Sequence, residues 1–196
     1  MSIYSKIMVL TKFHEGIRYQ CYLDTKQLLS WGIGWCLQKR PATGDERKAI
    51  AQMVGMSIDD IPFDYPVALG RWLDAQSQMH KVEIAHYMHS NTIKELIPQV
   101  ETRLGYWPDM NDNQQAAIVD ICYCMGIDGW IGNFPKTNML LVQAKYEEAS
   151  IELLDSDYHR DLVKHRPNSS FVLRSERISR MIATGEWPLD IEEPKE

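Results

Sequence analysis

Residues Phe13 to Leu37 read F-H-E-G-I-R-Y-Q-C-Y-L-D-T-K-Q-L-L-S-W-G-I-G-W-C-L, and this stretch decides how the rest of the chain is interpreted. It opens with Glu15 at the end of a predicted amphipathic helix. Two runs with strand character follow, over 17–22 and 28–35, and a polar turn that begins at Asp24 joins them. The pattern predicts a helix and then a small antiparallel sheet, with one carboxylate before the sheet and one at its turn.

Two glycines, Gly32 and Gly34, lie inside the second extended run. Glycine weakens a strand unless the backbone bends or approaches another group closely. We therefore expect a ligand to approach the sheet here, with Gly32 in a supporting role at the site. Two carboxylates in different surroundings, Glu15 and Asp24, are the minimum set for acid-assisted cleavage of a glycosidic bond.

This stretch resembles the active-site segment of the phage T4-type lysozymes, the endolysin muramidases of the glycoside hydrolase family 24 kind. E-G, then D-T, then S-W-G-I-G-W stands where that family has E-G, D-T and T-x-G-I-G-H. The resemblance implies that Glu15 is the general acid, Asp24 the second carboxylate, and Ser30 the residue that helps to place the attacking water. Serine replaces a threonine at position 30, and Trp35 replaces a histidine. We expect Trp35 to be a core aromatic, with a sugar-stacking platform as the alternative.

The resemblance continues in the second half of the chain. A-A-I-V-D-I-C-Y-C-M-G, residues 116–126, is similar to the family's core helix, and R-S-E-R-I-S-R-M-I-A-T-G-E-W, residues 174–187, to its closing helix. Arg174 then matches the arginine that faces the acid glutamate across the cleft, although a surface ion pair is an equal alternative. The similarity is weakest from Gln38 to Met79.

The resemblance implies an α+β, lysozyme-like fold, in which a small antiparallel sheet lobe is joined by a long helix to an α-helical lobe. We expect one domain over residues 1–196, made of a sheet-bearing lobe over 1–80 with a helical insertion at 38–79, a connecting helix over 81–104, a helical lobe over 105–188 and a frayed acidic tail over 189–196. The periodicity and capping residues also predict individual helices. These cover 45–54 with Asp45 as cap, 67–79, 82–104 with a break or kink near Asn91 and Pro98, 113–125, 136–144, 146–154 and 171–184, and a loop surrounds Gly129 and Gly132. The predicted cap of 113–125 is Asn111 or Asp112; that of 171–184 is Ser169 or Ser170, with Gly185 at its end.

Charge and targeting signals restrict the partners. The chain has 196 residues, 44% of them hydrophobic, and a formal net charge of −6, which disfavours nucleic acid as a partner. The resemblance implies bacterial peptidoglycan as the partner instead. The N-terminus shows no signal peptide, so we expect synthesis in the host cytoplasm and delivery to the cell wall, in the periplasm, by a holin, a virion or a secretion system. We expect a monomer.

Cysteines and histidines predict neither a metal nor another cofactor. The four cysteines show no zinc spacing, and we expect reduced thiols, although Cys21 and Cys36 lie on the two extended runs and would face each other there. Glu83, His86 and His89 resemble half of a di-iron site, but that site needs two Glu-x-x-His copies.

The function that the resemblance implies is peptidoglycan hydrolysis at the β-1,4 bond between N-acetylmuramic acid and N-acetylglucosamine. Hydrolysis by inversion needs a protonated carboxyl at the leaving oxygen and an ionised group that holds water on the opposite face of the sugar. Such an enzyme would be a bacteriolytic, antimicrobial lysozyme. Two alternatives stay open: a non-catalytic glycan-binding or structural module with this fold, and a hydrolase of chitosan-like or chitin-like polymers.

Overall fold

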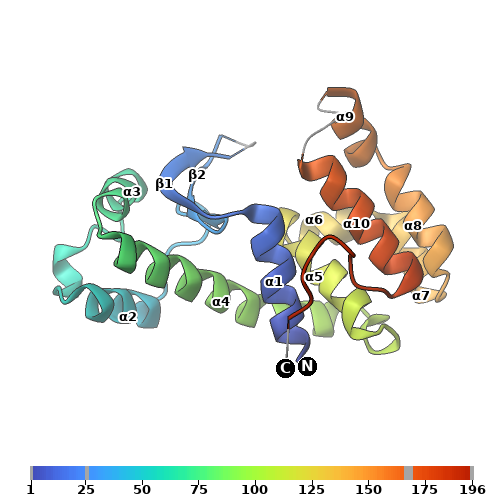
Figure 1. Cartoon of the computed structure of the whole chain (residues 1–196), viewed down its shortest axis with the longest axis horizontal. Coiled ribbons are helices and arrows are strands. Elements are labelled where there is room, and N and C mark those ends of the chain that lie inside the picture. The colour runs from blue at the N-terminus through green and yellow to red at the C-terminus, as the bar shows by residue number, and fades with distance from the viewer. Residues whose placement is uncertain (1, 25–26, 166–169, 195–196) are drawn as a thin grey trace. The chain divides into compact units, whose positions relative to one another are not determined.

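The structure is a computed structural model that describes residues 2–24, 27–165 and 170–194 (Figure 1). The chain divides into two compact units: a sheet-bearing unit, Glu15–Thr92, and a helical unit, Met1–His14 with Ile93–Glu196. The elements are α1 (Ile3–Glu15), β1 (Arg18–Leu23), β2 (Leu29–Gly32), β3 (Trp35–Cys36), α2 (Gly44–Val54), η1 (Ile58–Asp60), α3 (Pro66–Asp74), α4 (Gln78–Arg103), η2 (Trp107–Asp109), α5 (Asp112–Met125), α6 (Ile127–Asn133), α7 (Pro135–Val142), α8 (Tyr146–Leu154), α9 (Asp157–His165) and α10 (Ser170–Thr184). The predicted α+β class is confirmed.

The sheet is antiparallel, in the order β1-β2-β3. Tyr22 pairs with Ser30, and Ser30 pairs with Cys36. Because side chains alternate along a strand, these three share one face, and Cys21 points to the other. The expectation that Cys21 would face Cys36 is therefore wrong. Both thiols are free.

The second extended run, predicted over 28–35, is in fact two strands joined by a tight turn. Gly32 and Gly34 have φ angles of +66° and +71°, a left-handed conformation that glycine adopts without steric cost. The glycines therefore reverse the chain and create β3. A Cβ on Gly32 would lie 3.3 Å from the Cβ of Ala85, so the close approach at this glycine is to α4.

Helix α3 packs on β1 and β2. One oxygen of Asp74 accepts hydrogen bonds from the backbone N–H of Cys21, at 2.9 Å, and from the indole N–H of Trp31, at 3.2 Å. Gly70 lies so close to the sheet that a Cβ there would be 2.5 Å from Sγ of Cys21. The core that forms around this contact contains Trp31, Ile33, Trp35, Leu37, Ile50, Leu69, Leu73, Ile84 and Met88.

Helix α2 begins at Gly44, one residue earlier than predicted, because Thr43 rather than Asp45 is its cap. The Thr43 hydroxyl accepts from the N–H of Glu46, and the Glu46 carboxylate accepts from the N–H of Thr43 at 2.9 Å. This reciprocal arrangement satisfies two backbone donors at once. Arg40 also bonds Glu46, at 2.7 Å, so the buried carboxylate is paired.

Helix α4 is continuous from Gln78 to Arg103, so the predicted break at Asn91 and Pro98 is wrong. The Thr92 hydroxyl donates to the carbonyl of Met88 at 2.9 Å, which keeps this side chain inside the helix pattern. The predicted helix over 67–79 ends at Asp74, and residues from Gln78 onward belong to α4.

Helix α1 belongs to the helical unit as far as His14, because Ile7 and Leu10 pack into the core of this unit, whereas the prediction places 1–80 in the sheet-bearing lobe. Two helices were not predicted. Helix α6 occupies the expected loop around Gly129 and Gly132, since Trp130 is fully buried and its indole N–H donates to the Tyr106 hydroxyl at 2.8 Å. Helix α9 is the other. Asn111 caps α5 as predicted, and Gly185 follows α10 with a φ of +68°; Ser169, the other predicted cap of α10, lies outside the described residues.

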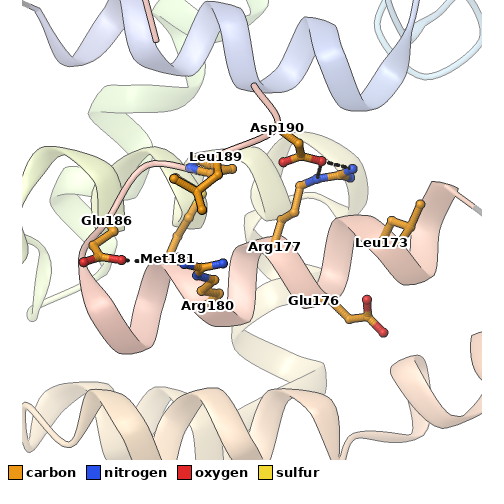
Figure 2. A pocket seen from close by; sticks show the side chains of 9 residues that line it. Leu173, Glu176, Arg177, Arg180, Met181, Glu186, Leu189 and Asp190 are labelled. Carbon is orange, nitrogen blue, oxygen red and sulfur yellow. Dashed lines mark hydrogen bonds and ion pairs between the residues drawn. The ribbon is translucent and has the colours of Figure 1, made fainter. Parts of the chain in front are cut away.

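The C-terminal segment, for which the prediction is a frayed tail, contacts the helical unit within 189–194, and 195–196 lie outside the described residues. Ile191 is 5% exposed, and its carbonyl accepts from the indole N–H of Trp187 at 2.9 Å. Figure 2 shows Asp190 beside Arg177 of α10, with Nε and Oδ2 2.8 Å apart. These contacts order the segment beyond α10.

A buried ionic cluster lies inside the helical unit. Arg174 donates from Nε to Oδ2 of Asp120 at 2.8 Å, and from a terminal nitrogen to the Asp120 carbonyl at 2.8 Å. Nδ1 of His14 lies 3.0 Å from the same Oδ2. Burial opposes ionisation of Asp120, but the charge of Arg174, helped by His14, outweighs it and lowers the pKa of this carboxyl. Asp120 is therefore a buried anion held by its partners.

The packing of α3 on the sheet is tested with Gly70→Ala. The new methyl meets the Cys21 sulfur, and we expect a loss of about 1–3 kcal/mol in the free energy of unfolding by urea. In a Cys21→Ala background the obstacle is gone, and the same change should be neutral or stabilising, because alanine favours helix over glycine. An equal loss in both backgrounds would contradict this packing.

The ionic cluster is tested with Asp120→Asn, which leaves a buried arginine without its counter-ion. We expect the free energy of unfolding to fall by about 3–5 kcal/mol at neutral pH. Asp128→Asn, which removes only a surface pair with Arg103, is the control and should cost under about 1 kcal/mol.

The difference in the free energy of unfolding between wild type and Asp120→Asn has a defined pH dependence. Because the native pKa of Asp120 is lowered, its contribution to stability is fully present above about pH 4, the ordinary value for aspartate. It is lost as the pH falls through the native value, so wild type and Asp120→Asn should converge in acid. A difference that stays constant down to pH 2 would refute the assignment.

Candidate functional site

Most of the predicted site residues belong to one compact unit. Glu15, Asp24 and Ser30 all lie in the sheet-bearing unit, as do Gly32 and Trp35. Arg174 belongs to the helical unit, where Asp120 binds it. The candidate site described below is therefore built from the end of α1 and the hairpin of β1 and β2.

Glu15 is the last residue of α1 and is half-buried. Gly16 follows it with a φ of +67°, a left-handed conformation that ends a helix and redirects the chain. The chain then enters β1 at Arg18. This helix end places the Glu15 carboxylate immediately before the first strand of the sheet.

Asp24 closes the β1–β2 turn. Its backbone N–H donates to the carbonyl of Leu28 at 2.9 Å, and its Oδ1 accepts from the N–H of Leu28 at 2.8 Å. The half-buried carboxylate therefore has a defined orientation from its own turn, in which aspartate bonds nearby backbone. Thr25 and Lys26, the next residues of the motif, lie outside the described residues.

Ser30 lies in the central strand and is 3% exposed. It pairs with Tyr22, so these two side chains lie on the same face of the hairpin, and Asp24 follows the end of β1 at the turn. Among the described residues, no hydrogen bond partner is found for the Ser30 hydroxyl.

Tyr22 lies opposite Ser30 in the hairpin and was not among the predicted site residues. Burial raises the pKa of Tyr22 to about 12; the negative charge of Glu15 adds to the rise, Arg18 opposes it, and Asp24 and Cys36 add to it. Both carboxylates thus lie close enough to act electrostatically on one phenol. The sequence carried a signal for this: Tyr22 precedes Asp24 by two residues in an alternating strand.

Two predicted supporting residues have structural roles. Trp35 is 3% exposed, packs in the core, and donates its indole N–H to the Arg40 carbonyl at 2.8 Å. A buried ring offers no face to a sugar, so the core interpretation of Trp35 holds. Gly32 is buried against Ala85 of α4 rather than open to a ligand. Its expected role in binding is replaced by a role in the turn.

Arg174 is 2% exposed, which excludes the surface ion pair considered as its alternative. Its partner Asp120 and the neighbouring His14 were not predicted to join it. The sequence held a signal here as well, because Asp120 is a lone charge in an apolar helical run, and such a charge needs a counter-ion when buried.

Other possible sites were considered across the described residues. Among them, no group of three or more His, Cys, Asp or Glu side chains is arranged to hold a metal, and this covers the stretch with Glu83, His86 and His89. In the part of the chain that the structure describes, the helices are too short or too polar to cross a membrane.

Surface hollows are found in both units. One of about 510 Å³ lies along β1 and is lined by residues that include Arg18, Tyr22 and Lys81. Another, of about 330 Å³, lies between α10 and the C-terminal segment (Figure 2). The arginines of the second hollow already bind Asp190 and Glu186, whereas the first adjoins the candidate site through Tyr22.

Comparison with known proteins agrees with the resemblance in the motifs. No family model matches the chain. The chain is similar to probable T4-type lysozyme 2 of Dictyostelium discoideum, with 21% identity over 181 residues that cover 92% of this chain and 95% of that protein. The similarity therefore includes both compact units and supports a relationship to the T4-type lysozymes at the level of the family.

Proposed function

We propose that this protein is a peptidoglycan hydrolase of the muramidase type, which cuts the β-1,4 bond between N-acetylmuramic acid and N-acetylglucosamine. The observation that carries the proposal is that two half-buried carboxylates flank β1: Glu15 ends α1 just before the strand, and Asp24 lies at the turn just after it, where Tyr22 pairs with Ser30. The full-length similarity to a protein named as a probable T4-type lysozyme supports the substrate class.

The mechanism needs only these side chains and water. Protonated Glu15 donates its proton to the glycosidic oxygen while the bond between that oxygen and the anomeric carbon breaks. A water held by Asp24 and the Ser30 hydroxyl adds to the anomeric carbon from the opposite face, and Asp24 accepts the water proton. The product sugar has the inverted configuration, and no cofactor enters the step.

The proposal includes the setting of the enzyme. It acts as a monomer on the cell wall after a holin, a virion or a secretion system has delivered it. The net charge of −6 gives no long-range attraction to an anionic wall, so delivery to the substrate, rather than electrostatic steering, brings enzyme and glycan together.

The role of Glu15 is tested with Glu15→Gln, which keeps size and removes the transferable proton. We expect the release of reducing ends from purified peptidoglycan to fall by about 10²-fold or more, since general acid catalysis contributes that much, with an unchanged melting temperature. Glu83→Gln, at an exposed position of the same unit, is the control and should be fully active. Wild-type activity in Glu15→Gln would refute the assignment.

Asp24→Asn separates the chemical role of this residue from its structural one. Asparagine keeps the oxygen that accepts from the N–H of Leu28 but loses the charge that takes the water proton. We expect a folded hairpin by circular dichroism and a loss of hydrolysis of about 10²-fold or more.

Substrate choice is measured on the wild-type protein in parallel, with analysis of the new reducing ends and of their anomeric configuration. N-acetylmuramic acid at the new reducing end, first released in the α configuration, is expected. Equal or faster cleavage of chitin or chitosan would instead identify a different glycan as the substrate.

A further inference from the structure

The position of Tyr22 is set by an irregularity in the sheet. Arg18 pairs with Gly32, and Tyr22 pairs with Ser30. Between these two pairs the chain advances by four residues in β1 but by only two in β2. Extra residues of this kind form a bulge, which redirects side chains and is common beside active sites. The bulge ends at Tyr22, directly before Asp24 and its turn.

Arg18 holds the ring of Tyr22. Its guanidinium carbon lies 4.4 Å from the centre of the ring, within the range of a cation–π interaction. Both residues line the hollow of about 510 Å³ along β1. The ring is thus supported by a cation and reachable from outside the protein.

The hydroxyl of Tyr22 has the properties of a ligand-binding donor. Burial and the neighbouring carboxylates keep it protonated, because its pKa is raised to about 12. No hydrogen bond partner of this hydroxyl is found among the described residues. A neutral O–H close to two carboxylates can donate to a sugar oxygen without competing with Asp24 for the water proton.

We propose that Tyr22 contacts the substrate, and that its hydroxyl donates a hydrogen bond to the sugar that Glu15 and Asp24 act upon. Arg18 is the positioning residue for the ring. The inference rests on the proposed function, because it assigns a further residue to the same site. It also separates the roles on this face: Ser30 and Asp24 hold water, and Tyr22 holds glycan.

The test is Tyr22→Phe, which keeps the ring and its contact with Arg18 and removes only the hydroxyl. We expect kcat/KM on soluble glycan strands from peptidoglycan to fall by about three- to tenfold, the effect of one neutral hydrogen bond. Tyr87→Phe is the matched control: it removes a tyrosine hydroxyl from α4 in the same unit, where Tyr87 packs against the core, and it should keep wild-type activity.

A second readout does not depend on turnover. The affinity of the same strands is measured by calorimetry for Glu15→Gln and for Glu15→Gln with Tyr22→Phe, below the melting temperature of both. A drop of about three- to tenfold in affinity supports the contact even if Tyr22→Phe is less stable.

The outcomes separate this inference from the proposed function. Unchanged kcat/KM and affinity in Tyr22→Phe, with an active wild type and an inactive Glu15→Gln, would overturn the role of Tyr22 alone. A Tyr87→Phe variant that loses as much as Tyr22→Phe would overturn it as well, because the effect would then follow from the loss of any tyrosine hydroxyl in the unit. A wild-type protein without activity on peptidoglycan would overturn the proposed function.

Discussion

The antiparallel pairing of β1 with β2 is the constraint on which the candidate site depends. It sets Tyr22 opposite Ser30, and the two hydrogen bonds between Asp24 and Leu28 close the ladder at its turn. A shift of one residue would move the side chains of one strand to the other face. The proposed chemistry would then lose its water-holding groups, although no residue had changed.

The opposite face of the sheet prevents such a shift. Cys21 and Trp31 both bond Asp74 of α3, and Gly70 allows α3 to approach the Cys21 sulfur. These contacts exist in one register only. The apolar face therefore specifies where the polar face presents its hydroxyls and carboxylate.

Carboxylates in this protein fall into two environments. Asp120 and Glu46 are buried and each binds an arginine, which is how proteins tolerate buried charge. Glu15 and Asp24 are half-buried, at the end of a helix and in a turn. The first pair is held inside each unit by its arginines, whereas the second pair is partly exposed to solvent.

The sequence alone determined the α+β class, the helix before the hairpin, the caps at Asn111 and Gly185, and the candidate acid and its second carboxylate, because local patterns and short motifs encode them. Only the tertiary structure decided that Gly32 turns the chain, that Trp35 is buried, that Asp120 binds Arg174, and that Tyr22 lies opposite Ser30. These depend on strand register and on contacts between residues far apart in the chain, which no local pattern contains. Burial then decides whether a charged or aromatic side chain holds the fold or faces a ligand.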